Sequence, residues 1–320
     1  MVDEHQSFVK ICPCGHTNTA KFPENVTGPV GYGPHIKSTA VYLSVQQMIP
    51  EDRLKQTFED VFKLPISTAT LTKISSRFAE KAEPIQEKVL VTLKKAKRKN
   101  ADESGFRIGG KTNWLQNLSN KTHTYYKPTE KRGDVFKEGL SGILVHDHFK
   151  PYNMIKTVQH AFCNAHHLRE LKALRDIEKE EWASKMYQLL CGANRCENPS
   201  KARVIKTYDR ILKEGFHFHE AQMPLSKRKN KRRVGHNLLI RLRDHKEGTL
   251  RFLTDRQCPF TNNQAEQDIR MMKVKQKISG GFRTMKGAKI FCTIRGFLST
   301  SRKQGCNIFG AIHLMHSPCR

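Results

Sequence analysis

Three acidic residues, far apart in the chain, are candidates for a metal-dependent site. Asp102 lies in a short extended segment, Asp147 follows an apolar run, and Glu266 lies in a stretch that predicts a helix. Carboxylates gathered in one place repel one another unless a cation neutralises them. Hard oxygen ligands of this kind select Mg²⁺ or Mn²⁺, and two such ions can support in-line attack on a phosphodiester.

The stretch from Thr261 to Lys273 predicts a helix that would hold one of these acids rigidly. Thr261 and the two asparagines after it suit a helix start, because their side chains can accept hydrogen bonds from free backbone N–H groups. Beyond that start, Glu266, Arg270 and Lys273 fall at i, i+4 and i+7 and share one face. This pattern alone also fits a solvated helix face with a Glu–Arg ion pair.

The segments around the other two acids predict a sheet. We expect strands, in chain order, over residues 100–108, 112–118, 122–126, 143–145 and 157–162. Gly109-Gly110 is a hairpin signal, and residues 132–137 are compatible with a helix. Asp147 follows the end of a buried-type strand, where α/β proteins keep their ligands. The order of elements, with acids on the first and fourth strands, predicts an α/β fold with a ribonuclease-H-like catalytic core.

Composition and charge restrict the class of partner. The 320 residues carry a net charge of +27, which predicts a polyanionic partner, foremost nucleic acid. A membrane surface would also attract such a chain, but no 18-residue apolar run or signal-like segment appears, so we expect no membrane partner. Nine cysteines without regular spacing favour reduced thiols in a cytoplasmic protein.

The first 35 residues contain Cys12-Pro-Cys14, which is half of a zinc-site pattern. One residue separates the cysteines, whereas zinc sites usually place two to four there, and no second pair follows nearby. We interpret residues 1–35 as the remnant of a zinc-binding-like segment followed by a linker rich in proline and glycine. Zinc at Cys12 and Cys14 stays an open alternative.

Residues 36–95 predict a small helical domain. Apolar spacing favours helices over 36–62, with a new start at Pro50, then over 67–78 and 84–95. The tight turn at Leu64-Pro65 is compatible with a helix-turn-helix whose second helix enters a DNA groove. Ordinary helices that pack on the next domain would show the same pattern.

The 118 residues between Asp147 and Glu266 are too many for one connection inside a compact core. We expect helices over residues 164–191, 201–215 and 236–253, and we interpret residues 170–255 as a mostly helical insertion. A basic segment in it is either a solvated loop or a contact with the DNA backbone. Its cations are Lys227, Arg228, Lys229, Lys231, Arg232 and Arg233.

Two histidine-containing motifs accompany the acids. Cys163 and His166 are one helical turn apart and form only half of a zinc pattern, so we expect packing and hydrogen bonding at a helix start. His146 and His148 flank Asp147, and for them we expect a role other than metal ligation.

Five parts are therefore expected along the chain. They are the zinc-like remnant and linker (1–35), the helical region (36–95), the first part of the core (96–169), the helical insertion with its basic loop (170–255), and the second part of the core with the catalytic helix (256–320). Gly280-Gly281 should end that helix, and residues 286–302 predict another.

The chain resembles the IS66 family of insertion-sequence transposases, bacterial enzymes of the DDE type. The likeness extends from about residue 10 to about residue 310. The motifs that carry it are 101–105 with 109–111, 145–152, 163–171, 259–266 and 273–283.

The resemblance implies that Asp102, Asp147 and Glu266 are a catalytic triad that holds two Mg²⁺ or Mn²⁺ ions. Water would attack the phosphodiester at the transposon ends, and the freed 3′-hydroxyl would attack target DNA. The residues expected to bind DNA here are Arg270, Lys273, Lys275, Lys277 and Arg283. We also expect a homo-oligomer on DNA, element-encoded accessory proteins, and a place in the bacterial cytoplasm at the nucleoid.

The sequence also departs from the family pattern. Family members usually carry Asp where Thr261 stands and Arg where Gln267 stands, and both positions adjoin Glu266. The N-terminus is shorter than usual and the C-terminus ends abruptly, which predicts a truncated copy. Two alternatives follow, namely a ribonuclease-H-like nuclease or junction resolvase, and an inactive remnant that still binds DNA.

Overall fold

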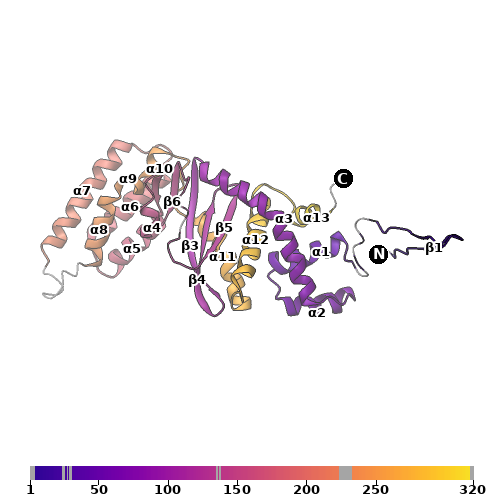
Figure 1. The fold of residues 1–320 in the computed structure, drawn as a ribbon. Helices are drawn as coiled ribbons and strands as arrows, with labels where there is room; N and C mark the ends of the chain where they lie inside the picture. The colour runs from indigo at the N-terminus through magenta and orange to yellow at the C-terminus, as the bar shows by residue number, and fades with distance from the viewer. Residues whose placement is uncertain are drawn as a thin grey trace.

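The structure is a computed structural model that describes residues 4–23, 26, 28, 31–134, 136, 138–222 and 233–317. The molecule is elongated, with a sheet between two groups of helices (Figure 1). Helices from the middle of the sequence lie at one end. Helices from the N-terminal and C-terminal parts lie together at the other end (Figure 1).

A mixed five-stranded sheet forms the centre. Its strands are β3 (Arg98–Ile108), β4 (Lys111–Ser119), β5 (Thr124–Thr129), β6 (Ile143–His146) and β7 (Gln159–Phe162). Their spatial order is β5-β4-β3-β6-β7, with antiparallel pairing from β5 to β3 and parallel pairing from β3 to β7. The five expected strands are thus present, and the α/β class is confirmed.

The expected helix over residues 132–137 is wrong for the residues that the structure describes there, which form turns and coil. A short helix, α4 (Lys150–Asn153), follows only after β6. The guanidinium of Arg132 lies between two aromatic rings, 4.6 Å from the ring centroid of Trp114 and 4.6 Å from that of Phe149. These cation–π contacts hold the segment against the sheet. They depend on residues distant in the sequence, so local helix propensity does not indicate them.

The residues that follow β7, as far as residue 254, form helices with a hydrophobic core of their own. They are α5 (Asn164–Asp176), α6 (Glu181–Arg195), α7 (Lys201–Glu220), α8 (Val234–Asp244), α9 (Lys246–Thr249) and α10 (Arg251–Thr254). Trp182, Met186 and Tyr208 are buried among leucines of these helices. Of the basic segment, only Arg233 lies in the described part of the chain.

A bidentate ion pair joins the chain after these helices to the sheet. The Arg98 guanidinium, at the start of β3, donates from Nε and Nη2 to the two carboxylate oxygens of Asp255 at 2.7 and 2.6 Å. Bidentate pairs of this kind define an orientation as well as a contact. The chain therefore re-enters the sheet region at a definite place after the helices.

The other end of the molecule is built from both termini. Its helices are α1 (Pro34–Val41), the π-turn η1 (Tyr42–Gln46), α2 (Glu51–Phe62), α3 (Thr68–Lys95), α11 (Asn263–Ser279), α12 (Met285–Lys303) and α13 (Ile308–His316). They share one hydrophobic cluster with residues of β3, β4 and β5. Within it the rings of Phe78 and Phe297 pack edge to face, with centroids 5.4 Å apart.

Helix α3 is one 28-residue helix where two were expected. Its apolar stripe, which includes Leu71, Ile74 and Phe78, is buried against the cluster along the whole first half. Pro84 lies inside the helix on its exposed face. A carbonyl that a proline leaves without its N–H partner can reach water there, so packing outweighs the local break.

The N-terminal residues form a hairpin that was not expected. Strands β1 (Val9–Ile11) and β2 (Thr17–Thr19) pair antiparallel and extend away from the helices (Figure 1). Cys12 and Cys14 lie in the connecting turn, where hydrogen bonds from the His16 backbone and the Cys12 side chain lower the pKa of Cys14. No third ligand joins these two cysteines among the described residues. Zinc at this turn stays a prediction.

The eight cysteines within the described ranges are all free thiols, in line with the expected reduced state. No described helix is both long and apolar enough to cross a membrane.

Candidate functional site

Asp102 lies on β3, and Asp147 directly follows the neighbouring parallel strand β6. Asn100 is in register with Val145 where β3 pairs with β6, and each aspartate lies two residues further along. Neighbouring strands run about 4.8 Å apart, so the pairing brings the two aspartates to the same level of the sheet. The hydrogen-bonded register of the two strands therefore accounts for their proximity.

Backbone amides orient both carboxylates. Oδ1 of Asp102 accepts from the N–H of Glu103 at 2.9 Å, and Oδ1 of Asp147 accepts from the N–H of Phe149 at 3.0 Å. The second contact is the usual Asx turn, in which an aspartate at a chain bend binds an amide two residues on.

Glu266 approaches these two aspartates from helix α11. Burial first, and then the negative charges of Asp147, Glu266 and neighbouring Glu103, raise the pKa of Asp102 to about 7, against the lowering effect of the Glu103 N–H. The charges of Asp147 and Glu266 thus act on Asp102. Within the described ranges, however, the carboxylate oxygens of these three acids do not all lie within 4.8 Å of one another. Among the described residues, no ion pair neutralises Asp102, Asp147 or Glu266.

Glu103 is a fourth acid next to Asp102, but it has partners of its own. Its carboxylate accepts from Nε of Arg132 at 2.7 Å and from Nε2 of Gln116 at 3.1 Å. The Glu103 side chain is only 6% exposed, so this paired carboxylate is part of the sheet's packing. Asp102, Asp147 and Glu266, which form no ion pair among the described residues, are therefore the acids available to bind a cation.

Asn262 fixes the start of helix α11 against strand β3. The residue is 1% exposed. Its Nδ2 donates to the carbonyl of Ala101 at 2.8 Å, and its Oδ1 accepts from Nδ2 of Asn100 at 2.9 Å. Asn262 is the N-cap residue, but within the described helix its side chain caps no backbone N–H. The expected capping by this side chain is therefore wrong, because the amide binds the neighbouring strand instead.

The middle and the end of α11 are also bound to β3. The Lys273 ammonium donates to the carbonyl of Gly105 at 2.6 Å. Beyond the helix, Phe282 donates to the carbonyl of Arg107 at 2.9 Å and accepts from the N–H of Gly109 at 2.8 Å. Contacts at three points along its length hold the helix that carries Glu266 parallel to the strand that carries Asp102.

Two glycines make the turn after α11, as the sequence predicted. Gly280 has φ 69° and closes the helix in the left-handed conformation. Gly281 has φ 133°, and a Cβ added there would lie 2.4 Å from the carbonyl oxygen of Arg107. Only glycine permits this backbone conformation together with so close an approach to β3.

Asp268 and Lys303 form a buried ion pair that the sequence reading missed. Their Oδ2 and Nζ are 2.7 Å apart, with the side chains 8% and 12% exposed. Tyr126 donates to the backbone carbonyl of Asp268 at 2.7 Å. These contacts hold the back of α11 to β5 and α12. Lys303, at the end of an apolar helix, was the one signal in the sequence that could have indicated this ion pair.

Exposed cations continue from the site along one face of α11. Arg270, Lys273 and Lys277 are exposed, and so is Arg283 after the turn. Lys275 differs, because its ammonium lies 5.7 Å from the ring centroid of Phe291 and burial lowers its pKa. Among the described residues no ion pair joins Glu266 to Arg270. The alternative of a solvated helix face with a Glu–Arg ion pair is therefore not observed there.

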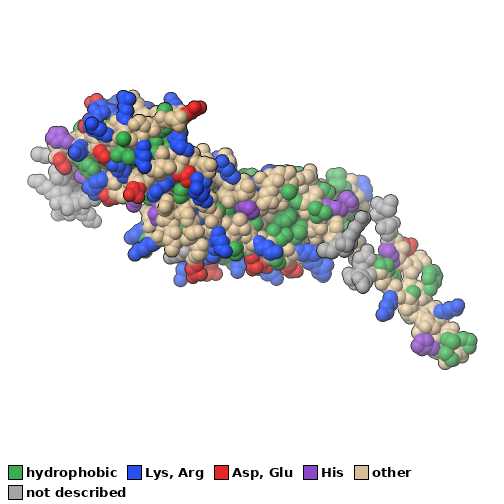
Figure 2. Space-filling model, turned by 90° about the horizontal axis from the view of Figure 1, so that it is seen from above, with side chains coloured by type: hydrophobic (Ala, Val, Ile, Leu, Met, Phe, Trp, Pro, Cys, Tyr) green, Lys and Arg blue, Asp and Glu red, His purple; other side chains and the backbone are tan. Residues whose placement is uncertain are grey.

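Lys and Arg side chains also spread over much of one face of the molecule, with Asp and Glu among them (Figure 2). The excess of positive charge is therefore distributed over the surface as well as gathered beside the acids. A surface of this kind attracts a polyanion from many directions.

Of the histidines beside Asp147, His146 is buried and His148 is half-buried. His146 is fully buried, its Nε2 lies 2.9 Å from Nδ1 of His160, and burial lowers its pKa to about 3. His148 stacks on the ring of Phe162 with centroids 4.2 Å apart. Both histidines contact the ring of Phe162. The expectation that they are not metal ligands stays a prediction.

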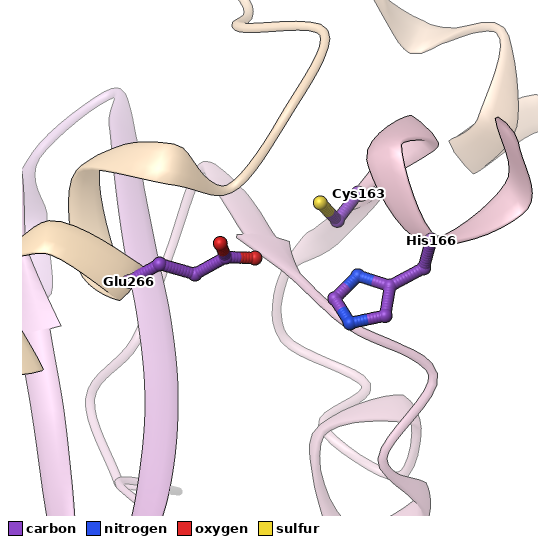
Figure 3. A group of neighbouring side chains, drawn as sticks. All are labelled: Cys163, His166 and Glu266. Atoms are coloured by element: carbon purple, nitrogen blue, oxygen red, sulfur yellow. The ribbon is translucent and has the colours of Figure 1, made fainter. Parts of the chain in front are cut away.

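Glu266 has two further neighbours with metal-ligand chemistry. A sulfur atom of Cys163, a ring nitrogen of His166 and a carboxylate oxygen of Glu266 all lie within 4.8 Å of one another. Figure 3 shows the three side chains directed toward one another from the start of α5 and the first turn of α11. The same carboxylate therefore faces two different sets of donors.

The model of a protein family described as the IS66 transposase family matches residues 30–290. This range contains all three acids, the cations of α11 and the connecting helices. No curated protein matches the chain.

Proposed function

The chain belongs to the IS66 transposase family, and we propose that it cleaves DNA at transposon ends and joins the freed ends to target DNA. The observation that carries this proposal is the register of β3 and β6, which sets Asp102 and Asp147 at one level of the sheet, together with the charge of Glu266 that acts on Asp102 from helix α11. Three carboxylates without a neutralising partner, in a strongly basic chain, suit a divalent ion and a DNA substrate.

We further propose that the sheet is a ribonuclease-H-like core. Three antiparallel strands followed by two parallel ones, with an acid on the first and one directly after the fourth, support this assignment. Helices α5 to α10 would then be an insertion within the core at residues 170–255, and their separate hydrophobic cluster supports that division.

The residues present fit Mg²⁺ or Mn²⁺ at the triad. Asp102, Asp147 and Glu266 offer only oxygen donors. Burial first, and then the nearby negative charges that a cation would neutralise, raise the pKa of Asp102. Two bound ions would supply activation of a water or 3′-hydroxyl and stabilisation of the leaving oxygen. The Asx turn at Asp147 and the anchored helix α11 present the donor atoms before substrate arrives.

The chain's own contribution on the DNA side is a row of cations. Arg270 and Lys277 are exposed along α11 and Arg283 is exposed after it, and Lys273 adds its charge to this row while binding Gly105. Such contacts position a phosphate backbone without reading its sequence. The basic segment at 227–232 lies outside the described residues and remains an expected DNA contact. Since two transposon ends must meet, we propose that the protein works as a homo-oligomer on DNA.

A strand-transfer assay with Mg²⁺ and a transposon-end DNA tests the proposal. The wild-type protein should cut and join, whereas Asp102→Asn, Asp147→Asn and Glu266→Gln should each lose at least about 100-fold in rate, as expected for a lost catalytic ligand. Glu130→Gln, at an exposed acid after β5, is the matched control and should keep its rate.

The same assay separates the alternatives. Hydrolysis without joining would indicate a nuclease or resolvase. Salt-dependent DNA binding without any metal-dependent cleavage would indicate an inactive remnant and contradict the proposal.

A further inference from the structure

Cys163, His166 and Glu266 form a cluster that the proposed reaction does not explain. The reaction requires oxygen donors for Mg²⁺, and it assigns no task to a thiol or an imidazole beside Glu266. Their three donor atoms lie within 4.8 Å of one another, and Figure 3 shows them directed into one space. A cysteine and a histidine one helical turn apart present their side chains on the same side of a helix start.

The backbone holds the thiol firmly in this position. Cys163 donates its N–H to the carbonyl of His146 at 2.9 Å, and the N–H of Asn164 binds the carbonyl of Phe260 at 3.0 Å. The N–H of Asn262 donates to the sulfur of Cys163 at 3.1 Å. This amide donor favours the thiolate, but burial outweighs it and raises the pKa of the Cys163 thiol, so the metal must displace the thiol proton. The start of α5 and the approach to α11 are thus joined through the cysteine itself.

The imidazole and the carboxylate of this cluster lack protein partners among the described residues. Nδ1 of His166 is buried and has no hydrogen-bond partner among the described residues. Glu266 forms no ion pair within the same described ranges. A buried imidazole nitrogen without a partner costs free energy, and coordination of a cation is one way to remove that cost.

The donor types differ from those of the triad. One thiolate, one imidazole and one carboxylate form a borderline set that favours Zn²⁺ over Mg²⁺. Bonds of about 2.0–2.3 Å from a tetrahedral zinc ion place donor atoms roughly 3.3–3.7 Å apart. The donor atoms, now up to 4.8 Å apart, can reach those separations if side-chain rotations move them by about 1 Å. Three protein ligands would leave the fourth position to a water molecule.

We propose that Cys163, His166 and Glu266 bind one Zn²⁺ ion, and that this ion takes the Glu266 carboxylate from the catalytic Mg²⁺ site. Binding replaces the proton of the Cys163 thiol with the metal and releases that proton to solvent. Zinc binding itself depends on neither Asp102 nor Asp147. The resulting inhibition of strand transfer by zinc rests on the proposed function.

Titration of the full chain with Co²⁺ tests the site, since cobalt bound to a thiolate has a charge-transfer absorption in the near ultraviolet. A Cys12→Ser, Cys14→Ser background excludes the N-terminal cysteines as the source. We expect one equivalent of Co²⁺ with this band, displaced by Zn²⁺. Cys163→Ser should abolish the band, and His166→Gln and Glu266→Gln should weaken binding at least about 10-fold.

Asp102→Asn is the matched control and should retain the band. A band that survives Cys163→Ser, or that requires Asp102, would overturn the site. Cys163→Ser keeps an acceptor for the Asn262 N–H, and thermal unfolding checks that it folds. Should that variant fail to fold, His166→Gln, which leaves the thiol in place, decides the outcome.

Strand transfer in Mg²⁺ then tests the consequence. Zinc should inhibit the Cys12→Ser, Cys14→Ser protein, whereas addition of Cys163→Ser should remove the inhibition, with each rate compared with that of the same variant without zinc. A cobalt band without any strand transfer would leave the zinc site standing and contradict the proposed function. Triad-dependent strand transfer without a cobalt band would contradict the zinc site alone.

Discussion

The side-chain amide of Asn262 donates a 2.8 Å hydrogen bond to the backbone carbonyl of Ala101, 161 positions away in the sequence. Ala101 directly precedes Asp102, and the carbonyl of Asn262 accepts the helical hydrogen bond from the N–H of Glu266 at 3.2 Å. One buried side chain therefore links the backbones that carry the first and the third acid.

Replacement of Asn262 by alanine should loosen the site and destabilise the protein. The variant removes two hydrogen bonds and leaves the buried amide of Asn100 without its partner, a loss of about 2–3 kcal/mol in the free energy of unfolding. Urea denaturation measures that loss, and strand transfer should fall more than the stability change explains. Asn263→Ala, at an exposed neighbour, is the control. Equal stability of the two variants would contradict the assigned role.

Replacement of Gly281 by alanine should damage the junction between α11 and β3. The residue has φ 133°, and the added Cβ would meet the carbonyl oxygen of Arg107. We expect a loss of at least about 2 kcal/mol in stability by thermal or urea unfolding. Gly280→Asn is the comparison, because asparagine tolerates the left-handed conformation and that position is open. If both variants unfold at the same urea concentration, the close approach has no energetic importance.

The stability of the metal-free protein should fall as pH decreases from about 6.5 to 5, and His167 contributes to this. Its Nδ1 is 3.0 Å from Oδ1 of Asn164, an acceptor, so Nδ1 carries the proton and Nε2 accepts from His148. Burial, and then the charges of Arg241 and neighbouring histidines, lower the pKa of His167 to about 3 from 6.5.

The sign follows from proton binding in the two states. Below pH 6.5 the unfolded chain binds a proton that folded His167 does not, so acid favours unfolding, by up to about 2 kcal/mol at pH 5. His167→Gln should reduce this pH dependence in urea denaturation at pH 7 and pH 5. His217→Gln, at an exposed position of α7, should leave it unchanged. An unaltered slope in the first variant would refute the assignment.

DNA binding should distinguish two cations on the same helix. Arg270→Gln should weaken binding to any DNA sequence and reduce the slope of log K against log salt by about 1, as for one lost phosphate contact. Lys275→Gln should change that slope much less, because the Lys275 ammonium lies over Phe291. Fluorescence anisotropy at several salt concentrations measures both. A larger effect from Lys275 would place the DNA on the other face of α11.

The sheet could be predicted from the sequence because its signals are local. Apolar runs such as 143–145 and the glycine pair at 109–110 define strands and a hairpin without knowledge of the rest of the chain. The end of α11 at Gly280 is local in the same way. These patterns were sufficient to predict Asp102 on one strand of the sheet and Asp147 directly after another.

Elements that depend on distant partners could not be predicted in this way. Asn262 looks like a helix cap in sequence, but its amide binds Ala101, which no local pattern indicates. The segment around Arg132 looks helical until the rings of Trp114 and Phe149 are brought to it. Pro84 suggests a helix break that packing of α3 overrides. The assembly of the triad itself depends on such long-range contacts.

The most direct test of the central claim is strand transfer by Asp102→Cys in Mg²⁺ and in Mn²⁺. A thiolate is a poor ligand for Mg²⁺ and a better one for the softer Mn²⁺. If Asp102 holds the catalytic ion, the variant should give no joined product in Mg²⁺ and measurable product in Mn²⁺, while the wild type is active in both. Wild-type rates from the variant in Mg²⁺ would show that Asp102 is not a metal ligand and would contradict the account.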